Sequence, residues 1–212
     1  MTKPVVHGPT FSTYVRSVRM AFIEKGQDHE LVHVDMLAGE HKAPAHLARH
    51  PFGKVPALAH GDFALYETDA ILRYVDEALP GAPLQPQDPR QRARMNQAMA
   101  LINAYAYPAI IGQVVLPRFL ASMQHAQPDE AAIAAAVPRV ELCLKELERI
   151  MGQGPYLAHA DLSLADLLLA PIYAYLTGTP EARVLQDRPG LQRWWGAMSQ
   201  RVSLAETEPE LG

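Results

Sequence analysis

The chain has 212 residues, of which 49% are hydrophobic and 20% are charged, and its formal net charge is −4. This length accommodates one large domain or two small ones, and the composition is ordinary for a soluble globular protein. The slight negative charge gives no reason to expect a nucleic acid or an anionic membrane as a partner.

Residues 4–79 alternate between strand and helix signals. Apolar residues at helical spacing predict a helix from Thr13 to Lys25, with Gly26 as its C-terminal stop. Two strand signals flank His60-Gly61-Asp62, a pattern typical of a hairpin. Thr68 is expected to cap the next helix. The predicted order is β-α-β-α-β-β-α, which a thioredoxin-like fold satisfies. The predicted strands are 4–7, 31–34, 55–59 and 63–66, with a loop at 40–42. The predicted helices are 13–25, one that starts at Pro44, and one from Thr68 to about Leu79.

The second half of the chain reads as helix after a proline-rich linker at residues 80–89. A long apolar-periodic helix is predicted over 90–122, which Pro108 and Pro117 must kink or divide. Pro128-Asp129-Glu130 opens another helix, and Pro138 either kinks that helix or separates two. Further predictions are a capping box at Ser163-x-x-Asp166 before the apolar run 167–176, a final helix at 190–202 and a loose tail at 205–212.

Three short segments of the first half suit a surface that holds a small acidic peptide. In Val55-Pro56 the proline cannot donate to a sheet, so the valine beside it is free to offer its N–H and C=O to a ligand. Glu67-Thr68 opens a predicted helix, whose unpaired amides and positive dipole end attract a carboxylate. Lys42 and Lys54 supply positive charge nearby.

These segments resemble the glutathione site of the glutathione S-transferases, and most of all the phi class and its bacterial relatives. The matching runs are Gly8-Pro9-Thr10-Phe11-Ser12-Thr13, Glu40-His41-Lys42, residues 51–58 and Leu162–Leu167. The similarity is dense over residues 5–80 and sparse after about residue 90. It implies the cytosolic glutathione transferase architecture, with an α/β thioredoxin-like N-terminal domain (1–80) that binds glutathione, a linker (81–89) and an all-α C-terminal helical domain (90–212) that contributes the electrophile pocket.

Ser12 stands where the resemblance places the catalytic hydroxyl. A free thiol with a pKa of about 8.5 is only about 3% ionised at pH 7, and lowering that pKa by about two units requires roughly 2.7 kcal/mol. A hydroxyl that donates to the thiolate contributes roughly 1.5–3 kcal/mol, and a helix N-terminus adds roughly 0.3–2 kcal/mol. Together these suffice without a general base. The alternative is that Ser12 only caps the first helix.

The resemblance also assigns the residues that bind glutathione. His41 and Lys42 lie in the loop that approaches the glycine carboxylate, and Val55 pairs with the cysteinyl backbone as an added strand would. Pro56 is expected to be cis. Glu67 and Thr68 hold the γ-glutamyl end, where the family usually has serine in place of Thr68. Lys54 stands where phi proteins often have glutamine. This replacement either strengthens carboxylate binding or loses an amide contact.

The second substrate is expected to be a small apolar electrophile. Its candidate pocket residues are Phe11, Tyr14, Tyr105, Tyr107, Ile111, Val115 and Phe119, and ordinary core packing is the alternative for most of them. The family implies a homodimer, in which Phe52 is a candidate to plug a pocket of the partner. Arg16 and Arg19 read as a solvated face of the first helix, rather than as catalytic groups.

Competing functions remain open on the same residues. Peroxidase, isomerase or dehalogenase activity would use the same glutathione site, and a non-catalytic carrier of apolar ligands would keep the fold alone. Glutathione is expected as a co-substrate, and no metal or other cofactor is expected. Among the nine histidines, His46 and His50 are spaced i, i+4, but no His-Glu-x-x-His motif occurs.

The single cysteine, Cys143, excludes an intrachain disulfide and a Cys-x-x-Cys redox pair, and it is expected to be buried. No uninterrupted apolar run approaches the roughly 20 residues of a membrane span. Residues 1–4 lack the apolar core of a secretory signal, so a cytoplasmic detoxification enzyme is the simplest expectation.

Overall fold

The computed structural model describes residues 2–157 and 160–209. The described residues of 1–85 and 199–212 form one compact unit, and those of 86–198 form the other. The first unit combines a sheet with helices and the second is helical, which confirms the predicted fold class. Residues 199–209, which the sequence assigns to the helical domain, pack in the structure with the first unit.

The first unit is built on a four-stranded sheet in the order β2-β1-β3-β4. Strand β1 (Val5–His7) pairs in parallel with β2 (Glu30–Val32) and antiparallel with β3 (Ala57–His60), which pairs antiparallel with β4 (Phe63–Tyr66). Val6 faces Leu31 on one side and Leu58 on the other. Val6 and Leu58 are almost fully buried, so the centre of the sheet belongs to the hydrophobic core.

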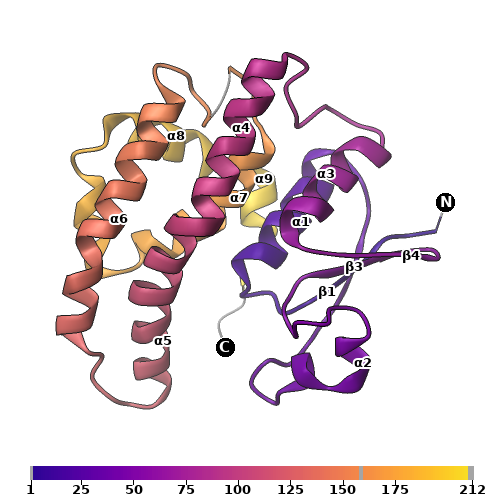
Figure 1. The fold of residues 1–212 in the computed structure, drawn as a ribbon, viewed down its shortest axis with the longest axis horizontal. Helices are drawn as coiled ribbons and strands as arrows, with labels where there is room; N and C mark the ends of the chain where they lie inside the picture. Colours follow the sequence, from indigo (N-terminus) through magenta and orange to yellow (C-terminus); the bar gives the residue numbers. More distant parts are fainter. Residues whose placement is uncertain (1, 158–159, 210–212) are drawn as a thin grey trace. The chain divides into compact units, whose positions relative to one another are not determined.

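Helices α1 (Thr13–Glu24) and α3 (Thr68–Ala78) pack against each other on one face of this sheet, and the short α2 (Pro44–Leu47) lies on the other (Figure 1). The apolar residues predicted for α1 are its buried face. Gly26 adopts a φ of +65°, as expected of a residue that ends a helix. The predicted loop at 40–42 is a 3-10 helix, η1 (Glu40–Lys42).

The structure corrects several of the predicted boundaries in this unit. Strand β3 begins at Ala57 instead of residue 55, because Pro56 cannot donate to the ladder. Strand β2 ends at Val32 instead of residue 34. The cap of α3 is Glu67, and Thr68 is the first residue inside the helix.

In the second unit, one continuous helix spans Pro89–Met123. It consists of α4 (Pro89–Leu101), two π-helical segments, η2 (Ile102–Ala106) and η3 (Pro108–Val115), and α5 (Leu116–Met123). The backbone N–H of Tyr107 bonds to the carbonyl of Ile102, five residues earlier. These wider turns accommodate a proline ring that would clash in a regular α-helix, so Pro108 and Pro117 do not divide the helix.

Within the described residues, Pro89–Met123 is the one helix that could cross a membrane on length and composition alone, a test that core helices of soluble proteins also pass.

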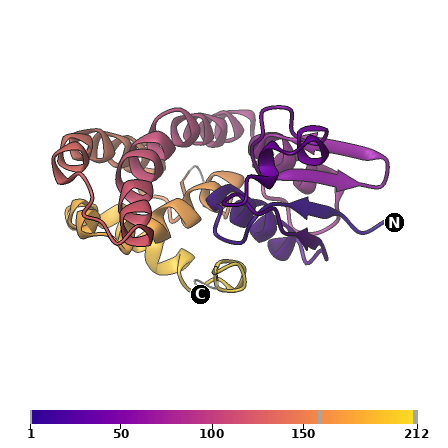
Figure 2. The ribbon, with the colours of Figure 1, turned by 90° about the horizontal axis from the view of Figure 1, so that it is seen from below.

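Helix α6 (Glu130–Met151) runs beside the Pro89–Met123 helix (Figure 2). It continues through Pro138 as one helix, so this proline does not separate two helices. The remaining elements of this unit are α7 (Leu164–Thr177), the 3-10 helix η4 (Pro180–Leu185) and α8 (Pro189–Met198).

The core of the second unit is centred on α7, which is buried along nearly its whole length. At its start the predicted capping box is present, and the buried carboxylate of Asp166 accepts four hydrogen bonds of 2.7–2.8 Å. Two come from the amide and hydroxyl of Ser163, one from the amide of Leu157 and one from the Trp194 indole. Cys143 is buried, as predicted.

The C-terminal segment differs from its prediction. Helix α8 ends at Met198, and a separate helix, α9 (Val202–Ala205), packs against α1 in the first unit. Beyond it the chain is not a loose tail up to residue 209, because Thr207 is fully buried and its hydroxyl donates to the carbonyl of Ser203 at 2.8 Å. Residues 210–212 of the predicted tail lie outside the described residues.

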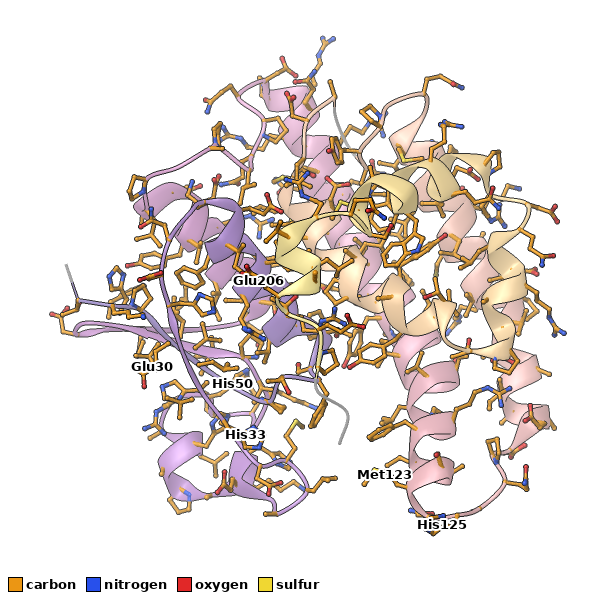
Figure 3. The ribbon with its side chains drawn as sticks, turned by 180° about the vertical axis from the view of Figure 1, so that it is seen from behind. Glu30, His33, His50, Met123, His125 and Glu206 are labelled. Carbon is orange, nitrogen blue, oxygen red and sulfur yellow. The ribbon has the colours of Figure 1, made fainter. Side chains whose placement is uncertain are left out.

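The same contacts correct the prediction for Arg16 and Arg19. Arg16 is only 3% exposed and donates to the carbonyl of Leu204 at 3.5 Å. Arg19 donates to the carbonyl of Glu206, which is labelled near the end of α9 in Figure 3, at 3.2 Å. Both guanidinium groups therefore hold the C-terminal segment and do not form a solvated face.

Candidate functional site

Ser12 caps helix α1. Its backbone is extended, with φ −68° and ψ 122°, and its side-chain oxygen accepts from the amide of Val15 at 3.4 Å. A hydroxyl carries one donor hydrogen and two lone pairs, so this contact leaves the hydrogen available to donate elsewhere. The cap role and a role as donor to an anion are therefore compatible. The side chain is half-buried and lies at the positive end of the helix dipole.

Gly8 brings the segment before Ser12 against the turn at Val55. A Cβ atom at position 8 would lie 2.4 Å from Cγ2 of Val15 and 3.3 Å from Cβ of Val55. No side chain fits in this space, so the glycine is required by close packing. The Gly8–Ser12 turn and Val55 consequently border the same part of the first unit.

Val55 immediately precedes the sheet. The peptide bond between Val55 and Pro56 is cis, as expected. Strand β3 pairs with β1 only from Ala57, opposite His7, so the backbone groups of Val55 lie beyond this ladder. An extended peptide placed here would continue the pattern of the sheet.

Glu67 caps α3 with an unusual backbone. Its φ is +72° and its ψ is 118°, a region that a residue with a side chain rarely adopts and that costs of order 1–3 kcal/mol. The Glu67 side chain is exposed and the Thr68 side chain is buried. The strained residue thus places a carboxylate and the first amides of α3 side by side at a helix N-terminus, where a ligand with both charged ends can bind.

The loop that carries the candidate cations is held together by Gly53 and His46. A Cβ atom on Gly53, whose φ is +59°, would lie 3.0 Å from the carbonyl oxygen of His41. The Nε2 atom of His46 lies 2.7 Å from the carbonyl oxygen of Lys54. Residues 41–42 and 53–54 are therefore neighbours, with the side chains of Lys42 and Lys54 exposed.

Two buried histidines belong to this region, although the sequence pointed to neither as part of the site. His46 and His50 are 3% and 2% exposed, and their rings stack with centroids 6.5 Å apart. His50 lies between α2 and the sheet (Figure 3), where its ring centroid is 4.8 Å from that of Tyr66. Burial lowers the pKa of His50, against the opposing effect of Glu67. The i, i+4 spacing of the two histidines is the one signal in the sequence, and it indicates a metal motif as readily as a structural pair.

No group of three or more potential ligands that could hold a metal ion occurs among the described residues. The candidate electrophile residues fall in both units. Phe11, Tyr14, Tyr107, Ile111 and Val115 are half-buried. Tyr105 and Phe119 keep 62% and 39% of their surfaces exposed, so neither is an ordinary core residue.

Comparison with known proteins adds independent information. The family model described as "Glutathione S-transferase, N-terminal domain" matches residues 6–83, and "Glutathione S-transferase, C-terminal domain" matches residues 100–201. Glutathione S-transferase F9 of Arabidopsis thaliana is 33% identical over 205 residues, which cover 95% of this chain and 94% of that protein.

Solved structures agree with these matches. The crystal structure of glutathione transferase F7 from Populus trichocarpa superposes with a TM-score of 0.87 at 32% identity, covering 96% of this chain and 97% of that one. Maize glutathione S-transferase I in complex with an atrazine glutathione conjugate gives a TM-score of 0.85 at 28% identity, covering 97% and 96%.

Proposed function

Because this chain belongs to the glutathione S-transferase family, we propose that it joins glutathione to small apolar electrophiles and that Ser12 keeps the attacking thiol ionised. The observation that carries the proposal is the position of Ser12, which caps α1 through a lone pair and retains its hydrogen for a second partner. The hydroxyl acts as a fixed donor and never as a nucleophile. Its hydrogen bond and the α1 dipole together match the roughly 2.7 kcal/mol needed to lower a thiol pKa by about two units.

In this proposal the tripeptide lies across the edge of the first unit. Val55 pairs with its cysteinyl backbone, and Pro56 fixes that turn. Glu67 and Thr68, at the N-terminus of α3, hold the γ-glutamyl end, whose amine faces a carboxylate and whose carboxylate faces helix amides. His41, Lys42 and Lys54 attract the glycine carboxylate. The exposure of Lys42 and Lys54 suits them to attract the ligand electrostatically more than to bind it tightly.

The residues proposed to contact the electrophile are Phe11 and Tyr14 in the first unit and Tyr105, Ile111, Val115 and Phe119 in the second. An apolar pocket that excludes water strengthens the hydrogen bond from Ser12 to the thiolate. The maize relative was crystallised with a glutathione conjugate of atrazine. We propose a similar class of substrate for this chain, namely apolar molecules with an electrophilic carbon atom. We further propose a cytoplasmic homodimer with a role in detoxification, to which Phe52, 71% exposed, contributes a contact.

Substitution of Ser12 by alanine tests the mechanism. With 1-chloro-2,4-dinitrobenzene as acceptor, we expect Ser12→Ala to lower kcat/KM about 10- to 150-fold, in line with the loss of a hydrogen bond to a charged group. The pKa of bound glutathione, followed by thiolate absorbance, should rise towards that of free thiol. Ser17→Ala is the matched control, because the Ser17 hydroxyl donates to the carbonyl of Thr13 on the same helix.

An unchanged thiol pKa in Ser12→Ala would contradict the mechanism. If glutathione binds tightly and no electrophile is turned over, the chain is a carrier. If peroxide is reduced or an alkyl halide is dehalogenated while 1-chloro-2,4-dinitrobenzene is not consumed, the glutathione site stands and the proposed reaction does not.

A further inference from the structure

The side chain of His46 joins α2 to the turn that carries two proposed glutathione contacts. Its Nε2 atom lies 2.7 Å from the backbone carbonyl oxygen of Lys54, eight residues further along the chain. A carbonyl oxygen can only accept a hydrogen bond, so this contact requires the hydrogen on Nε2. The bond fixes the backbone of Lys54, which is followed directly by Val55.

The other ring nitrogen of His46 has no place for a second hydrogen. Its Nδ1 atom is buried and has no hydrogen-bond partner within residues 2–157 and 160–209, and the same holds for Nδ1 of His50. A neutral His46 satisfies the site with its single hydrogen on Nε2. A protonated His46 would bury an N–H and a positive charge without an acceptor, which is unfavourable in a protein interior.

We propose that His46 is a positioning residue for glutathione: through the hydrogen on Nε2 it holds the Lys54–Val55 turn in the binding geometry. The inference rests on the proposed function, since Lys54 and Val55 matter only where the tripeptide binds there. Ser12 caps a different element, α1, so we expect the chemical step to be unaffected. The expected signature of losing the His46 donor is a weaker affinity for glutathione with little change in kcat.

Two variants separate the hydrogen bond from the packing of the ring. His46→Phe keeps an aromatic ring and removes the donor, and we expect it to weaken binding about 3- to 10-fold at pH 7.5 with kcat within about twofold. His46→Gln keeps an N–H donor, so it should bind nearly as the wild type does at pH 7.5. His33→Gln is the control, because His33 is an exposed histidine of the same unit.

The probe is S-methylglutathione, whose affinity is measured by calorimetry at pH 7.5. It has no thiol to ionise, so its affinity reports binding alone. His46→Phe should bind it more weakly than the wild type, whereas His46→Gln and His33→Gln should bind it nearly as the wild type does. Thermal unfolding of each variant verifies that it is folded.

Equal affinity of His46→Phe and the wild type would overturn the inference, as would an affinity of His46→Gln as low as that of His46→Phe. Failure of the wild type to bind the probe at pH 7.5 would overturn the proposed function instead. Nitrogen-15 spectra of the His46 ring provide a readout that is independent of binding. A hydrogen on Nδ1 at pH 7.5 would contradict the role proposed for this side chain.

Discussion

Ser12 and Ser163 occupy the same local position, one at the start of α1 and the other at the start of α7, yet their hydroxyl groups are used differently. Ser163 is fully buried, and its hydroxyl donates to the Asp166 carboxylate at 2.7 Å. Ser12 is half-buried, and its oxygen accepts a longer bond of 3.4 Å from Val15. The hydrogen of Ser163 is committed to the fold, whereas that of Ser12 is available to a ligand.

The difference follows from the residues around each cap. The α7 cap has a carboxylate three residues into the helix, and that carboxylate also binds Leu157 and Trp194 from other segments. The first turn of α1 contains no acidic residue. A carboxylate there would take the serine hydrogen and repel a thiolate, so its absence suits the site proposed for Ser12.

The largest expected effect comes from removing the acceptor in the buried cap. Asp166→Ala leaves two amides, a hydroxyl and the Trp194 indole without their shared partner. We expect the free energy of unfolding to fall by about 3–5 kcal/mol, since several buried donors lose their acceptor at once. Chemical denaturation followed by tryptophan fluorescence measures it. A loss below about 1 kcal/mol would mean that the cap is not an important part of the core.

Substitution of Ser163 should mainly lower stability, whereas substitution of Ser12 should mainly lower activity. Ser163→Ala is expected to cost about 1–3 kcal/mol of stability with kcat/KM unchanged in the folded enzyme, because the buried carboxylate loses a donor. Ser12→Ala should cost only about 0.5–1 kcal/mol of stability, as is typical when a helix cap is lost. Parallel denaturation and kinetic measurements check the pair. If both variants lost stability alone, Ser12 would be a cap and nothing more.

The order of elements in the first unit was predictable because its signals are local. The apolar spacing of α1, the glycine after it and the hairpin around Gly61 each depend on a few neighbouring residues. The same is true of the Ser163-x-x-Asp166 box. The π-helical turns were not predictable, because proline signals an interruption and does not indicate whether the helix widens or breaks.

The misses come from contacts between distant residues. Arg16 and Arg19 reach carbonyls 188 and 187 residues away, and a helix considered alone gives no sign of that. The role proposed for His46 depends on the backbone oxygen of Lys54, and the sequence does not indicate which backbone oxygen a side chain will contact. The positive φ of Glu67 was hidden as well, since glutamate does not signal it as glycine would.

The last prediction concerns the far end of α1, where Glu24 binds Arg201 and Ser203 of the C-terminal segment and only stability is expected to change. Burial opposes ionisation of this carboxyl, but the hydrogen bonds and charge of its partners outweigh it and hold its pKa below the ordinary value. A depressed pKa contributes stability above the unfolded-state pKa, and this stability is lost as the pH falls through the folded-state pKa. Stability should therefore decline in acid partly through Glu24.

Arg201→Met isolates this contribution. The variant removes the ion pair and its hydrogen bonds but leaves the apolar part of the side chain, so we expect a loss of about 1–2 kcal/mol at pH 7. The deficit relative to the wild type should shrink as the pH drops below the ordinary glutamate range, because the wild type then loses the same interaction. Urea denaturation at a series of pH values measures the difference. A deficit that stayed constant down to pH 3 would show that Arg201 supports α1 through packing and not through the charge on Glu24.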